Sequence, residues 1–154
     1  MAVDDADYAA FAADTLNLTP RLAVTLSGRY NDAEVVASPN ASELHHAPPN
    51  APRHTMSAFL DYHLPWRGIE IGGGVNCVSS RTASSLPVTG TTIVERAPGY
   101  VLGQLLLKAP ITPNLTAQLN VTNVNNATYY DGLHPGHIII GAARTALFTL
   151  SARL

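Results

Sequence analysis

The sequence predicts an all-β protein, an antiparallel up-and-down meander of about seven strands that forms part of a transmembrane β-barrel. The first observation is a regular alternation of tight, proline-containing turns with longer polar connections. The tight turns lie at residues 19–21, 65–68 and 112–114, and the longer connections at 33–52, 81–98 and 131–136. Short connections at one end of a sheet and long ones at the other are typical of outer-membrane barrels.

The second observation is period-two polarity, which predicts strands with one apolar side. Five segments show it clearly: residues 22–30, 55–64, 69–78, 115–123 and 148–154. One set of side chains is expected to form an apolar face: Val24, Leu26, Met56, Leu60, Ile71, Val75, Leu119, Val121, Phe148 and Leu150. The alternate set is expected to form a polar face: Thr25, Ser27, Asp61, Gln118, Asn120 and Thr149.

Two further segments complete the meander. The alanines of residues 8–18 also fit a helix, but this segment leads directly into a Thr-Pro turn and the next strand, so a strand is favoured. In residues 100–109 the triplet at 105–107 blurs the alternation, and Val101, Gly103, Leu105 and Leu107 are chosen as the apolar side. Three glycines at 72–74 weaken a strand, and they suit a bend or a place where bulky neighbours fill the wall.

The third observation is the scarcity of charge. Only 13% of the 154 residues are charged, against about 25% in an ordinary soluble domain. The net charge of -2 gives no basis for nucleic-acid binding, and the single Cys77 excludes an internal disulfide. No apolar run reaches the ~20 residues of a membrane-spanning helix, and the acidic start lacks the features of a signal peptide. A barrel needs export, so we expect either a removed signal or a longer parent chain.

Aromatic residues follow the expected ends of the strands. Tyr62 and Trp66 flank one tight turn, and a second group lies near the long connections: Tyr30, Tyr100, Tyr129 and Tyr130. Two bands of amphipathic rings are expected at the two membrane interfaces. The ordinary enrichment of tyrosine and tryptophan in strands is the alternative.

No constellation of residues predicts catalysis. His45 and His46, with Glu43 nearby, have the residue types of a transition-metal site, but they lie in a loop rich in proline and asparagine that a solvated loop tip explains better. The remaining histidines are scattered through the chain: His54, His63, His134 and His137. We therefore expect no enzyme activity, no catalytic or metal-binding residues and no cofactor, and the sequence identifies no ligand-binding residues.

Several stretches together resemble a known family. Residues 50–54 (NAPRH), 98–100 (PGY), 119–130 (LNVTNVNNATYY) and 141–145 (GAART), in this order, resemble the C-terminal strands of TonB-dependent outer-membrane receptors, especially those for ferric siderophores. Residues 8–30 look like a hairpin of the same family.

The resemblance implies a barrel of about 22 strands in the outer membrane, with a plug domain that contacts TonB and a ferric siderophore as the transported ligand. Residues 1–154 are expected to form a single partial barrel region without the plug, so this chain is not expected to contact TonB. Leu154 stands where the family's assembly signal prefers an aromatic residue.

The alternative is a small soluble β-sheet module for binding or interaction, without transport activity. The two differ in where the apolar face points, outward into lipid or inward into a packed core. On the barrel hypothesis the chain expressed alone aggregates or requires detergent, because seven strands leave two edges and a large apolar face uncovered. A Leu154→Phe change is then expected to increase membrane-inserted material.

Overall fold

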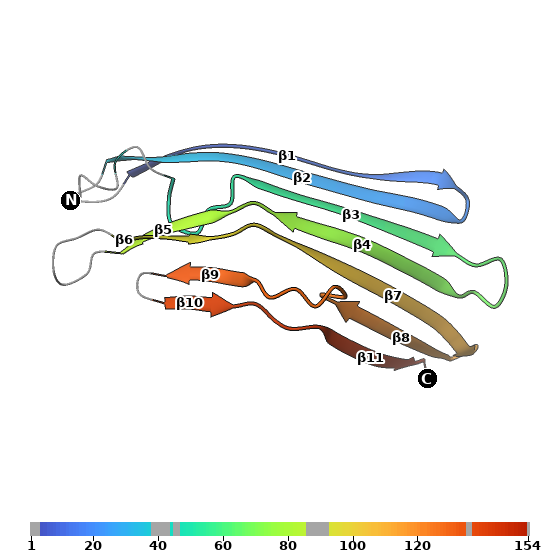
Figure 1. The fold of residues 1–154 in the computed structure, drawn as a ribbon. Coiled ribbons are helices and arrows are strands. Elements are labelled where there is room, and N and C mark those ends of the chain that lie inside the picture. Colours follow the sequence, from blue (N-terminus) through green and yellow to red (C-terminus); the bar gives the residue numbers. More distant parts are fainter. Residues whose placement is uncertain (1–3, 38–43, 45–46, 86–92, 135–136, 154) are drawn as a thin grey trace.

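The computed structural model is all-β and describes residues 4–37, 44, 47–85, 93–134 and 137–153. Seven strands form one antiparallel sheet in sequence order (Figure 1). They are β1 (Asp4–Thr19), β2 (Leu22–Ala37), β3 (His54–His63), β4 (Glu70–Val78), β7 (Tyr100–Thr112), β8 (Leu115–Thr122) and β11 (Thr145–Ala152). Within the described ranges no helix has both the length and the apolar character needed to cross a bilayer. The predicted meander of seven strands is confirmed, and residues 8–18 form a strand.

The three predicted tight turns reverse the chain at one end of the sheet, which we call the tight-turn end. Pro20 and Arg21 connect β1 to β2, and Pro113 and Asn114 connect β7 to β8. Between β3 and β4 the amide of Leu64 donates to the carbonyl of Ile69 at 2.8 Å. Arg67 and Gly68 in this connection have positive φ values of 60° each, a conformation that glycine adopts without steric cost.

The three long connections differ from the polar loops that were expected. β2 continues to Ala37 and pairs with β1 along its whole length. The second connection contains β5 (Arg81–Ser85) paired with β6 (Ile93–Ala97), and the third contains β9 (Tyr130–His134) paired with β10 (His137–Ile140). These two hairpins extend from the end of the sheet opposite the tight turns, the long-connection end (Figure 1). The sequences of these four strands (RTASS, IVERA, YDGLH and HIII) show no strict alternation of polarity, which is why the sequence did not predict them.

The pairing register confirms the two predicted faces. Val24 lies opposite Leu60, Ile71 opposite Leu107, and Leu119 opposite both Leu107 and Phe148, so the predicted apolar set shares one side of the sheet. On β3 the apolar-face residues Met56 and Leu60 are 57% and 46% exposed, whereas Ser57 and Asp61 on the polar face are half-buried. This is the reverse of a soluble sheet, in which the apolar face is the covered one.

The glycine run lies under an aromatic ring. Phe59 on β3 is on the polar face, and a Cβ built on Gly72 or Gly74 of β4 would lie 2.6 Å from its ring atoms. The ring therefore occupies the space that two side chains would otherwise fill. Of the two reasons considered for the glycines, bulky neighbours filling the wall is the one observed.

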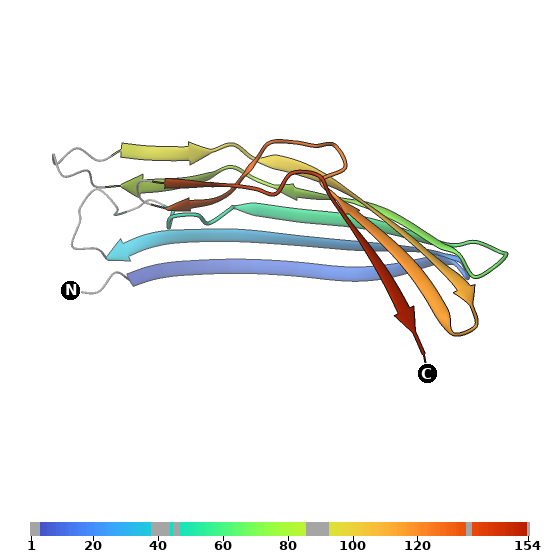
Figure 2. The ribbon, with the colours of Figure 1, turned by 90° about the horizontal axis from the view of Figure 1, so that it is seen from below.

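The sheet is curved and open (Figure 2), with β1 and β11 at its two edges. Because neighbouring strands alternate in direction across seven strands, β1 and β11 both run from the long-connection end to the tight-turn end. These two edges therefore cannot pair antiparallel with each other. An antiparallel barrel that includes this sheet needs an odd number of additional strands.

Candidate functional site

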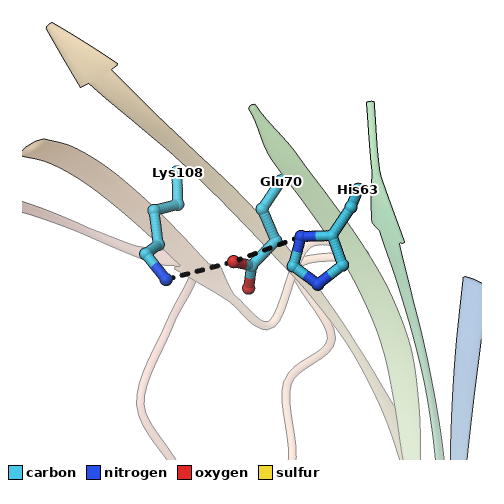
Figure 3. Close-up of polar contacts among 3 residues, drawn as sticks. All are labelled: His63, Glu70 and Lys108. Carbon is cyan, nitrogen blue, oxygen red and sulfur yellow. Dashed lines mark hydrogen bonds and ion pairs between the residues drawn. The ribbon is translucent and has the colours of Figure 1, made fainter. Parts of the chain in front are cut away.

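A charged cluster lies on the polar face near the tight-turn end. Asp61 and His63 are two residues apart on β3, so their side chains point to the same face. Glu70 lies opposite His63, and Lys108 opposite Glu70 (Figure 3). Glu70 Oε2 is 3.0 Å from Lys108 Nζ and 3.9 Å from His63 Nδ1.

The donor atoms of Asp61, His63 and Glu70 lie within 4.8 Å of one another, a separation compatible with a metal ion. The ammonium group of Lys108 already supplies a positive charge to Glu70, so the cluster is best described as a charge network on the polar face. Sequence reasoning treated His63 as isolated. Two features of the sequence could have predicted the cluster. The Asp-x-His pattern places two side chains on one face just before a tight turn, and the turn sets the register that brings Glu70 opposite His63.

At the long-connection end, the 119–130 motif forms a joint between β8 and β9. Asn123 is 3% exposed and has a φ of 52°. Its Nδ2 donates to the carbonyls of Ala127 and Ala142 at 2.9 and 3.0 Å, and its Oδ1 accepts from the amide of Ala127 at 2.9 Å. One side chain thus closes the turn and attaches it to the segment that leads into β11.

In the same joint, the side chain of Asn125 makes hydrogen bonds to the backbone of β7 like those a paired strand would make. Its Oδ1 accepts from the amide of Gly103 at 3.0 Å, and its Nδ2 donates to the carbonyl of Val101 at 2.9 Å. The amide group thereby satisfies backbone groups of β7 at the point where β8 leaves the sheet. Gly141 is the glycine of the GAART stretch, and the ring of Tyr129 occupies the space that a Cβ at this position would fill.

Arg81, the first residue of β5, lies at the centre of a second group of contacts at this end. Its guanidinium group donates to Asn50 Oδ1 at 3.1 Å, to the carbonyl of Asp131 at 2.8 Å and to the carbonyl of Tyr130. The Arg81 Cζ atom lies 5.7 Å from the centre of the Tyr100 ring. Sequence reasoning did not single out Arg81, because its hydrogen-bond partners lie 31 to 50 residues away in the chain.

The expected aromatic bands are only partly present. Tyr30 and Tyr62 are on the apolar face, and Tyr30 pairs with His54, eight residues before Tyr62 on β3. Eight residues span about 27 Å along a strand, close to the ~25 Å apolar band of an outer-membrane barrel before tilt is considered. The ring centres of Tyr100 and Tyr129 lie 4.5 Å apart, and Tyr130 packs against the cluster of Ala97 and Leu133. For these three residues the band stays a prediction.

The remaining histidines do not assemble into a site within the part of the chain that the structure describes. The ring of His54 is 5.2 Å from that of Tyr30, and His134 pairs with His137 in the β9–β10 hairpin. The group at Glu43, His45 and His46 lies outside the described residues. The expectations of no catalytic residue, no metal ligand and no cofactor stay predictions.

Comparison with known proteins shows which sequences and folds this chain is similar to. No family model matches the chain. The ferric-pyoverdine 358 receptor of Pseudomonas putida is 31% identical over 104 residues, which are 66% of this chain and 12% of the receptor. The probable TonB-dependent receptor BfrD of Bordetella pertussis is 29% identical over 138 residues, 86% of this chain and 18% of that protein.

The fold has solved counterparts. In the Pseudomonas aeruginosa receptor FpvA, bound to a ferric pyoverdine, the matched region covers 97% of this chain and 20% of the receptor, with a TM-score of 0.81 and 18% identity. This chain thus spans less than a quarter of each relative named here. In sequence and in fold, it is similar to a stretch of the β-barrel wall of TonB-dependent outer-membrane receptors.

Proposed function

We propose that this chain supplies wall strands and three outside connections to an outer-membrane receptor that takes up ferric siderophores. The observation that carries the proposal is the reversed polarity of the central strands β3, β4 and β7, on which the apolar-face side chains are exposed and the polar-face side chains are half-buried. In a barrel the apolar face contacts lipid and the polar face lines the interior. The names of the relatives support the siderophore as the class of cargo.

The proposal assigns residues 1–154 to a single partial barrel region without the plug. The plug, the contact with TonB and an odd number of additional strands then belong to other parts of the receptor. We propose no catalytic role and no resident cofactor, with the ferric siderophore as cargo. The Asp61–His63–Glu70–Lys108 network would line the interior, where water and polar groups of the receptor are available to charged side chains.

The soluble alternative has little support. It needs the apolar face to be enclosed, and among the described residues the buried apolar side chains are Val35, Ala97 and Leu133, none of which belongs to that face. All three lie toward the long-connection end of the chain's strands or in its hairpins. A sheet that leaves Met56, Leu60 and Phe148 exposed relies on another apolar medium to cover them.

Cysteine labelling in outer membranes from cells that produce the protein tests the proposal. In a Cys77→Ser background, Val75→Cys places a thiol on the apolar face and Asn76→Cys places one on the polar face of the same strand. We expect the thiol at position 75 to react with a maleimide confined to the bilayer, and the thiol at position 76 only with a water-soluble one. Equal reaction of both positions with the water-soluble reagent would favour the soluble alternative.

A further inference from the structure

The three long connections meet at one side chain. Arg81 belongs to the second connection, and its guanidinium group reaches Asn50 in the first and the carbonyls of Tyr130 and Asp131 in the third. The β5–β6 and β9–β10 hairpins lie next to each other at this end of the sheet (Figure 1). We propose that Arg81 fastens the three connections into one cooperative body, so that an event at one of them changes the stability of all three.

Burial of the charge is the reason for cooperativity. Arg81 is 7% exposed, and its described partners are two carbonyl oxygens, one amide oxygen and the Tyr100 ring rather than a carboxylate. A buried charge is tolerated only while its hydrogen bonds are made. If one connection moves away, the guanidinium loses partners that water must replace, and the contacts with the other two connections loosen as well.

Asn50 makes a second set of hydrogen bonds that join the three connections. It has a φ of 62°, a conformation that asparagine and aspartate adopt more readily than most residues. Its amide donates to the carbonyl of Thr82 at 2.9 Å, and its Oδ1 accepts both from Arg81 and from the amide of Leu133 at 3.3 Å. Asn50 therefore joins the same three connections through a different set of atoms.

An apolar contact also holds the second and third connections together. Leu133 of β9 is 1% exposed and clusters with the fully buried Ala97 of β6, while Tyr130 packs against both. These residues come from the second and third connections, so the hydrophobic contact and the Arg81 hydrogen bonds oppose the same separation. Part of the hydrophobic core of the described chain thus lies between connections, which is unusual for segments that would otherwise be independent loops.

Hydrogen exchange on the intact protein in detergent micelles tests the proposal, with peptides that report the amides of Asn50 and Leu133. We expect Arg81→Met to speed exchange about tenfold or more in both peptides, because the substitution removes buried hydrogen bonds to the first and the third connection at once. Arg81→Lys should not rescue protection, since one ammonium group cannot reproduce the planar fork that meets several acceptors. The matched control is Arg96→Met, which removes an exposed arginine of β6 that donates to Ser80 Oγ at 3.1 Å.

A gain-of-stability variant covers the case in which Arg81→Met misfolds. Asn50→Asp keeps the acceptor oxygen and adds an opposite charge beside Arg81, so exchange should slow in the Leu133 peptide as well as in the Asn50 peptide. Peptides from β8 and β11 should be unchanged in both variants. Faster exchange in only one connection, or an equal effect of Arg96→Met, would overturn the proposal, as would an Asn50→Asp effect confined to its own segment.

Discussion

The sheet and the long-connection end of this chain are stabilised in different ways. The sheet is held by backbone pairing between neighbouring strands, and its large apolar side chains remain exposed. The long-connection end encloses its own small core around Leu133 and buries Arg81 and Asn123 among hydrogen-bond partners. The sheet therefore leaves its apolar face to be covered by another apolar medium, whereas the long connections carry their own tertiary structure.

The largest expected effect is a charge placed on the lipid side of the wall. Leu119 and Gln118 are neighbours on β8 that point to opposite faces. Leu119→Arg should reduce the free energy of unfolding from lipid vesicles by about 2–4 kcal/mol, because arginine near the bilayer midplane is costly. Gln118→Arg on the polar face is the control and should change it by less than ~1 kcal/mol. Equal penalties measured by denaturant titration would contradict the assignment of the two faces.

The next effect belongs to the other region. Asn123→Asp keeps the acceptor oxygen but removes both Nδ2 donors, which leaves the carbonyls of Ala127 and Ala142 without this partner and introduces a buried charge. We expect a loss of about 2–3 kcal/mol. The loss should be similar in detergent and in lipid, since the site does not rely on the membrane. Asn120→Asp, the same substitution on the polar face of β8, should have a mild effect on the free energy of unfolding. A penalty for Asn123→Asp that disappears in detergent would contradict the conclusion that the long-connection end is stabilised independently of the membrane.

A smaller effect is expected where the wall is packed most tightly. A Cβ at Gly74 would lie 2.5 Å from the carbonyl oxygen of Ala58 and 2.6 Å from the Phe59 ring, so Gly74→Ala should destabilise by about 1–2 kcal/mol. Gly28→Ala, with nothing within 4 Å of the added carbon, should be neutral or slightly stabilising. Phe59→Ala should remove the destabilisation caused by Gly72→Ala, because the atoms closest to the added Cβ belong to the Phe59 ring. It should not remove the destabilisation caused by Gly74→Ala, because there the added Cβ also meets backbone atoms. Thermal unfolding of the double variants checks this order.

Much of the wall could be predicted from the sequence, because its determinants are local. Alternation of side chains in a strand assigns each residue to a face, and a tight turn sets the register of the next strand. The proline-containing turns and the faces of β2, β3, β4, β8 and β11 required nothing from distant parts of the chain. The scarcity of charge likewise pointed to a sheet whose apolar face meets something other than its own core.

Contacts between residues that are distant in the chain could not be predicted from the sequence. The Asp61–His63–Glu70–Lys108 network requires the registers of three strands at once, and the Arg81 contacts join residues from three separate connections. Short strands such as β5 (RTASS) and β10 (HIII) show no polarity period, so their pairing depends on packing against neighbours. Periodicity along the chain records the direction of each side chain but not its partner, because partners at long sequence separation are set by how the whole sheet and its hairpins come together.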